Sequence, residues 1–97
     1  MATRAYILSF DRNDEIDYVE FHNKLTTLPG ITTWSHYLMS SYILITDITN
    51  ATTLNNEIIK LLPPLKSILL IEVNLKNRNG KLVQSAWDWF NKVEKLT

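Results

Sequence analysis

The chain has 97 residues, enough for one domain, and its 45% hydrophobic and 21% charged residues are typical of a globular protein rather than a disordered one. Its 10 basic and 10 acidic residues cancel, which argues against strong non-specific binding to nucleic acid. The chain contains no cysteine, so disulfides, thiolate metal sites and a cysteine nucleophile are excluded.

The first part of the chain predicts a strand followed by a helix. Residues 4–10 (RAYILSF) are short, β-prone and almost wholly apolar, which indicates a strand covered on both faces. We expect a helix to begin at Asp14, which is a good N-cap, and to end at Pro29-Gly30. Its apolar face is formed by residues at three- and four-residue spacing, namely Tyr18, Phe21, Leu25 and Leu28.

Two strands close together in sequence predict a hairpin. Residues 31–38 (ITTWSHYL) are rich in side chains that favour the extended state, and residues 42–47 (YILITD) form a second such run. Ser40-Ser41 would provide a tight turn between them.

The second half of the chain predicts a helix, a strand and a closing helix. Asn50 or Thr52 caps the first of these helices, which must end by Pro63-Pro64. Residues 68–75 (ILLIEVNL) form the fourth strand, and residues 84–96 form a short amphipathic helix. The apolar face of the first helix comprises Leu54, Ile58, Leu61 and Leu65.

This order of elements predicts one α+β domain over residues 1–97, a ferredoxin-like βαββαβ sandwich with an antiparallel four-stranded sheet and a short C-terminal helix. Both main helices would cover the same face of the sheet. The first and third strands are apolar at consecutive positions, so the second face must also be covered. We expect Trp89 and Phe90 of the terminal helix to cover part of it and a second copy of the chain to cover the rest, as a homodimer.

Four segments of the sequence also carry a resemblance to a known family. In order they are AYILSFDRND, TTWSHYLMSSYILITD, ILLIEVNL and SAWDWFNKV. Together they resemble the small bacterial proteins called SinR-like, in which a first strand ends in Asp, a Trp-and-His strand leads through a Ser turn into an apolar strand, and an Ala-Trp-x-Trp helix closes the chain. That group in turn resembles the VapD toxins and the small spacer-acquisition nuclease subunit of CRISPR systems. The resemblance implies a ferredoxin-like homodimer that is either a metal-dependent nuclease or a DNA-binding scaffold.

The resemblance places the family's functional Asp on Asp11. In the nuclease members two such residues, one from each subunit, face each other and hold a divalent metal. Mg²⁺ or Mn²⁺ prefers hard oxygen ligands, and such an ion activates water and stabilises a phosphoryl transition state. Asp11 would then be both metal ligand and catalytic residue. Alternatively, Asp11 is a turn residue whose carboxylate accepts hydrogen bonds from the main chain.

Polar and basic residues elsewhere could contact a nucleic acid. The polar turn of the family falls on Ser40 and Ser41, and basic side chains follow the fourth strand. The candidate nucleic-acid contacts are Arg12, Ser40, Ser41, Lys76 and Arg78. The alternative for the basic residues is a solvated loop. His36 is either a general acid or base near neutral pH or a structural residue of the sheet.

These observations lead to two functional hypotheses. The first is a homodimer linked to nucleic acid or a nucleotide, with metal-dependent endonuclease activity through Asp11 left open. The alternative is a non-catalytic dimeric interaction or regulatory module. No apolar run approaches the roughly 20 residues of a membrane span, and the start of the chain does not have the pattern of a signal peptide, so we expect a cytoplasmic location and no membrane partner.

Overall fold

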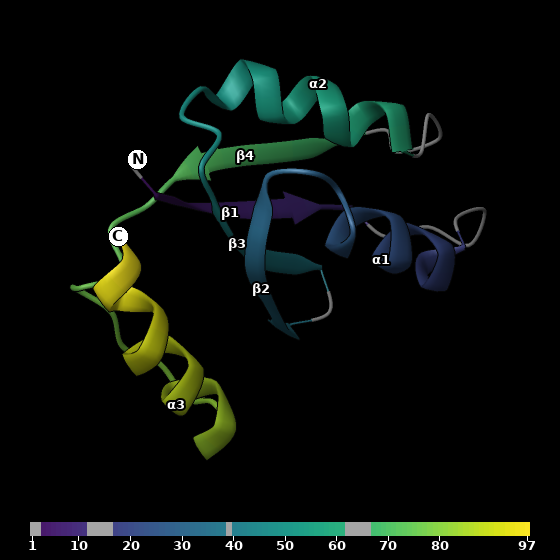
Figure 1. Ribbon diagram of the computed structural model, residues 1–97. Helices are drawn as coiled ribbons and strands as arrows, with labels where there is room; N and C mark the ends of the chain where they lie inside the picture. The colour runs from purple at the N-terminus through teal and green to yellow at the C-terminus, as the bar shows by residue number, and fades with distance from the viewer. Residues whose placement is uncertain (1–2, 12–16, 39, 62–66) are drawn as a thin grey trace.

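The computed structural model describes residues 3–11, 17–38, 40–61 and 67–97, and the statements below concern these residues (Figure 1). The elements in chain order are β1 (Arg4–Phe10), α1 (Tyr18–Thr26), β2 (Ile31–Leu38), β3 (Ser41–Thr46), α2 (Ala51–Leu61), β4 (Ile68–Glu72), α3 (Gln84–Val93) and a 3₁₀ turn (Glu94–Leu96).

The four strands form one antiparallel sheet in the order β2-β3-β1-β4. The first strand in sequence is therefore central, with Ile7 paired to Ile43 of β3 on one side and to Ile71 of β4 on the other. The order of elements and the antiparallel sheet confirm the predicted ferredoxin-like α+β fold with a short C-terminal helix (Figure 1).

The two main helices cover one face of the sheet. Figure 1 shows α1 and α2 packed on the sheet away from α3. Alternate side chains of β1 and β3 point into this layer because neighbouring residues of a strand face opposite sides. The buried core comprises Tyr6, Leu8, Phe10, Phe21, Leu25, Leu28, Tyr42, Leu44, Leu54 and Ile58. Their burial supplies the main apolar stabilisation of the fold.

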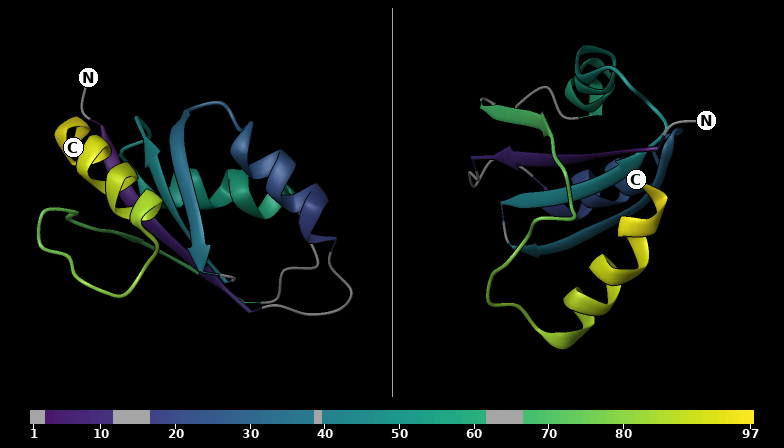
Figure 2. Two further views of the ribbon diagram at one scale, coloured as in Figure 1. Left: turned by 90° about the horizontal axis from the view of Figure 1, so that it is seen from below. Right: turned by 90° about the vertical axis from the view of Figure 1, so that its left-hand side faces the viewer.

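The closing helix packs on the other face. Ala5 and Ile45 of the sheet are buried there with Val93 of α3, and Trp89 and Phe90 pack against them. Figure 2 shows α3 crossing this face beside β2, and the indole nitrogen of Trp89 donates to the Thr33 hydroxyl of that strand. The expectation that the terminal helix covers part of the second face is confirmed.

The ends of the helices differ from the sequence-based boundaries. The first helix begins later than predicted, since Asp17 is its N-cap and accepts a hydrogen bond from the Glu20 amide at 3.0 Å. It ends at Thr26, before Pro29-Gly30. Of the two predicted caps of α2, Asn50 is confirmed, because its carboxamide oxygen accepts from the amides of Thr52 and Thr53, whereas Thr52 lies inside the helix. The predicted cap Asp14 and the predicted stop Pro63-Pro64 lie outside the described residues.

The fourth strand is shorter than predicted, ending at Glu72 rather than at Leu75. The Val73 amide still donates to the Ala5 carbonyl, but the Asn74 side chain then accepts from the Lys76 amide and turns the chain. This turn brings Leu75 under α3, where it is buried beside Val93. The physical reason for the early end is therefore this local side-chain hydrogen bond together with the burial of Leu75.

Candidate functional site

The predicted catalytic residue lies at the end of β1. Asp11 follows the strand directly, its side chain is exposed, and its amide donates to the Ser67 carbonyl at 3.2 Å. The preceding amide, that of Phe10, donates to the Ser40 carbonyl at 3.1 Å. The fold therefore brings Asp11 and the Ser40-Ser41 turn to the same end of the sheet.

The serines of that turn have different surroundings. Ser40 is exposed, whereas the Ser41 hydroxyl is half-buried and lies 3.3 Å from the hydroxyl of Ser9 on the neighbouring strand. Arg12, the basic candidate beside Asp11, lies outside the described residues. Asp11 thus offers an exposed carboxylate at this end of the sheet, and the turn offers the exposed Ser40 hydroxyl and the half-buried Ser41 hydroxyl.

A metal ion needs several oxygen or nitrogen ligands, and Asp11 supplies one carboxylate. Within residues 3–11, 17–38, 40–61 and 67–97, no group of three or more histidine or acidic side chains is placed to hold a metal ion. Mg²⁺ at this position would therefore take its other ligands from water, substrate phosphates or a second chain.

The two basic candidates lie at the opposite end of the sheet. Lys76 and Arg78 follow β4, whose last residue, Glu72, pairs with Tyr6 near the start of β1. Asp11 follows the other end of β1, about 20 Å away at the rise of an extended chain. The structure thus separates Lys76 and Arg78 from the serine turn, so all these residues could contact one nucleic acid only if it extended along the sheet.

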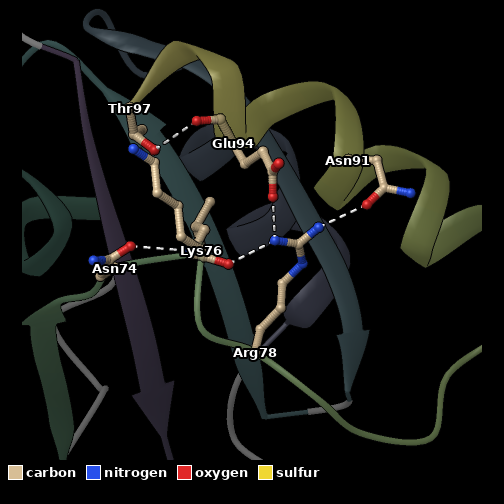
Figure 3. A network of polar contacts seen from close by, with 7 residues as sticks. Asn74, Lys76, Arg78, Asn91, Glu94 and Thr97 are labelled. Atoms are coloured by element: carbon tan, nitrogen blue, oxygen red, sulfur yellow. Dashed lines mark hydrogen bonds and ion pairs between the residues drawn. The ribbon is translucent and has the colours of Figure 1, made fainter.

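The Arg78 side chain is held within the protein (Figure 3). Its guanidinium donates to the Leu75 carbonyl at 2.7 Å, to the Glu94 carboxylate and to the Asn91 side chain at 2.7 Å. It also lies 5.5 Å from the ring centre of Phe90. These contacts tie the loop after β4 to α3, and a phosphate would have to compete with all of them for the guanidinium.

Lys76 lies at an open depression of about 480 Å³ at the start of β1. Arg4 and Glu72 also line it, and these two form a weak ion pair at 3.4 Å between exposed side chains. The depression thus combines two basic side chains and one acidic side chain, which does not favour a strongly anionic ligand.

Sequence spacing did not reveal a cluster of polar aromatic side chains between β2, β3 and α1. Nδ1 of His22 lies 2.7 Å from the hydroxyl oxygen of Tyr42, which is buried. The His36 ring stacks on Tyr42 with their centres 3.9 Å apart, and Trp34 meets His22 edge-on at 4.8 Å. The His36 ring thus packs on a side chain of the neighbouring strand, and its role as acid or base or as a structural residue stays a prediction. The residues come from three separate elements, so only the tertiary fold unites them.

Part of the face that carries α3 is not covered by any of the described residues. Pairing across the strands places Ile43, Ile7 and Ile71 in one row on this face. Burial decreases along the row away from α3: Ile43 and Ile7 are half-buried, while Ile71 is 47% exposed and its neighbour Leu69 is 57% exposed. We call Ile7, Leu69 and Ile71 the exposed half-sheet.

A small apolar cavity adjoins the exposed half-sheet on the side of α3. It has a volume of about 90 Å³ and is lined by Ile7 and Ile43, by Tyr37 and Leu38 of β2, by Leu82 and by Phe90. Leu38 is 59% exposed at its rim. The apolar surface therefore continues from β4 across the sheet to the hairpin end.

No family model, curated protein or solved structure matches this chain. None of the helices within the described residues is long and apolar enough to span a membrane.

Proposed function

We propose that this protein is a non-catalytic homodimeric interaction module that makes its contact through the β4 side of the sheet. The observation that carries the proposal is the exposed half-sheet, where Leu69 and Ile71 are about half exposed on a regular strand. Full burial of such a side chain contributes about 1.5–3 kcal/mol. A two-fold dimer buries the same surface on both copies, so each side chain contributes twice to the contact.

The polar residues support this proposal better than they support nucleic-acid binding. The net charge is zero, and the Arg78 guanidinium is engaged by Leu75, Asn91 and Glu94. A surface that binds phosphates needs basic groups free to neutralise them. The resemblance to SinR-like proteins supports a dimer as well, and the cytoplasmic location expected from the sequence is part of the same proposal.

The oligomeric state in solution tests the proposal. Sedimentation equilibrium of the wild-type chain is expected to give the mass of a dimer. Ile71→Lys places a charge on the exposed half-sheet and is expected to weaken dimerisation at least tenfold, which corresponds to about 1.4 kcal/mol. Val19→Lys is the matched control, because Val19 is an apolar residue of α1 that is 73% exposed. A monomeric wild-type chain would overturn the proposal.

A second candidate, a divalent-metal-dependent endonuclease acting through Asp11, is supported by one observation. Asp11 is exposed at a strand end beside the serine turn, where an incoming phosphate and its metal could reach the carboxylate. The test is cleavage of single- and double-stranded RNA and DNA with Mg²⁺ or Mn²⁺, compared with an EDTA control. Asp11→Asn should abolish cleavage, whereas Asp47→Asn, an exposed aspartate at the other end of the sheet, should not. Cleavage by the wild type but not by Asp11→Asn would replace the first candidate with the second.

A further inference from the structure

The two edges of the sheet differ in how well they are protected against pairing with another strand. The pairing of β2 with β3 has register shifts between Ile31 and Thr33 and between Ser35 and Leu38, which make that edge irregular. The pairing of β4 with β1 is regular from Ile68 to Glu72. Bulges are one of the devices by which natural proteins block an edge, and β4 has none.

The outer edge of β4 also carries little proline or charge, which are two other devices that protect an edge. Its residues Ile68–Ile71 include no proline and no charge, and Glu72 alone is ionised. Among the described residues, β4 pairs with β1 and with no other strand, so the outward main-chain N–H and C=O groups of β4 have no strand partner. An extended chain is the group that satisfies such a row of donors and acceptors.

Apolar side chains flank this free edge on both faces of the sheet. Leu69 and Ile71 are exposed on the face that carries α3. On the other face, Thr52 and Asn55 of α2 line an open groove of about 250 Å³ along Ile68 and Leu70 of β4. Ile59 continues the same stripe of α2 by helical spacing and is 47% exposed. A partner at this edge would therefore cover apolar groups above and below it.

We infer that the β4 strands of two copies pair edge to edge, antiparallel, about a two-fold axis at Leu70. This inference rests on the proposed function and specifies its contact. An axis at Leu70 gives the greatest overlap of the five-residue strand, with Leu69 opposite Ile71 of the other copy and Ile68 opposite Glu72. Leu69 and Ile71, the exposed apolar side chains of β4, then each gain an apolar cross-strand neighbour.

Charge and closure favour the same arrangement. In this register the two Glu72 carboxylates lie at opposite ends of the pairing, about 14 Å apart along the strands, which is beyond the screening length at physiological salt. Among the described strands of each chain, β4 offers the one regular free edge, so pairing uses both of these edges and stops at two copies. The product is a closed dimer with a continuous sheet rather than a growing fibre.

The register has a consequence for the metal hypothesis. Asp11 lies beside Ser67 at the start of β4, so antiparallel pairing places the two Asp11 residues at opposite ends of the joint sheet. The strand spacing and rise put them more than about 20 Å apart, too far to share one ion. The edge dimer and a shared Asp11 metal site therefore exclude each other.

Cysteine cross-linking tests the register directly, because the chain contains no cysteine of its own. Leu69→Cys and Ile71→Cys are made as separate variants. The two are mixed, partially unfolded and refolded together so that they exchange partners, and then oxidised mildly. Directly opposite residues of paired strands have Cα atoms about 4.5–5.5 Å apart, which is within disulfide range, whereas diagonal neighbours are farther apart. The mixture should give at least about tenfold more disulfide-linked dimer than either variant alone. Replacing Leu69→Cys with Val19→Cys in the mixture should remove the linked dimer.

Each alternative outcome has a defined meaning. Strong self-linking of Leu69→Cys alone would place the axis elsewhere and overturn the register. A wild-type dimer by sedimentation without a link between positions 69 and 71 would overturn edge pairing and leave the proposed interaction module standing. A monomeric wild-type chain, together with no link, would overturn both.

Discussion

The hydroxyl oxygen of Tyr42 lies 2.7 Å from Nδ1 of His22, so a buried side chain of the sheet is joined to α1 by a polar contact inside an otherwise apolar layer. The Tyr42 ring is also in contact with Phe10 and Phe21, which hold it between the sheet and the helix. The position of α1 thus depends on one hydrogen bond as well as on apolar packing.

Tyr42→Phe should lower the free energy of unfolding by about 1 kcal/mol, because it removes the hydroxyl and leaves the half-buried imidazole without that partner. Urea denaturation followed by circular dichroism measures this loss. Tyr37→Phe provides the comparison, since Tyr37 is 41% exposed and should change stability by less than about 0.5 kcal/mol. Equal effects of the two substitutions would show that the contact with His22 does not stabilise the fold.

Arg78→Met should lower stability by about 2–3 kcal/mol, because the half-buried guanidinium ties the loop after β4 to α3 through Glu94 and Asn91. The loss should appear first in α3 as a change in the fluorescence of its tryptophans. Lys76→Met is the matched control: it removes a basic residue two positions away whose side chain is exposed. If both variants unfold at the same urea concentration, Arg78 does not anchor α3.

Gly30→Ala should destabilise the protein by about 1–2 kcal/mol, because Gly30 has a φ of +96°, a conformation that side chains disfavour. A Cβ there would also lie 2.9 Å from Cδ1 of Ile48, so that side chain would have to shift. At Gly80 the added Cβ would meet its nearest atom, in the Trp87 ring, at 3.9 Å. Gly80→Ala should therefore cost nothing measurable, and thermal unfolding of the two variants gives the comparison.

Stability should fall as the pH rises above about 10, with part of the fall due to Tyr6. Burial, followed by the nearby Glu72 carboxylate, raises the pKa of the Tyr6 phenol, while Arg4 acts in the opposite direction. The unfolded chain releases this proton near pH 10 and the folded chain at higher pH, so the folded state binds more protons in that interval and stability declines with pH.

The Tyr6→Phe variant lacks this proton, so it should lose less stability than the wild type between pH 9 and pH 11. Urea denaturation at the two pH values measures the difference. Tyr37→Phe again serves as the comparison, since it removes the hydroxyl of an exposed tyrosine instead of a buried one. A Tyr6→Phe variant that declines as steeply as the wild type would contradict the assignment.

The elements that the sequence predicted well are those whose signals are local. The second strand is observed over Ile31–Leu38 as predicted, since β-prone side chains occupy the whole run. The cap at Asn50 was also predictable, because its carboxamide bonds to amides two and three residues ahead. Asp14 and Asp17 carry the same capping chemistry, and the sequence offered no means of choosing Asp17 for the start of α1.

The parts that could not be predicted depend on contacts between distant residues. The end of β4 is set by the burial of Leu75 under α3. The Arg78 guanidinium is held by the carboxylate of Glu94, which lies 16 residues away in the sequence. Leu69 and Ile71 share one face because side chains alternate along a strand, and this follows from the predicted strand over residues 68–75. Their exposure was not, because it depends on how far α3 extends across the sheet.

The central place of β1 sets the order in which the protein can fold as it is synthesised. β1 precedes both of its sheet neighbours in the chain, because β3 begins at Ser41 and β4 at Ile68. Its apolar residues therefore lack one of their two sheet partners until β4 has been synthesised. Closing these long loops makes folding slower than for a helical bundle of equal length. Until β4 has been synthesised, β1 keeps one unpaired apolar edge and needs protection from aggregation.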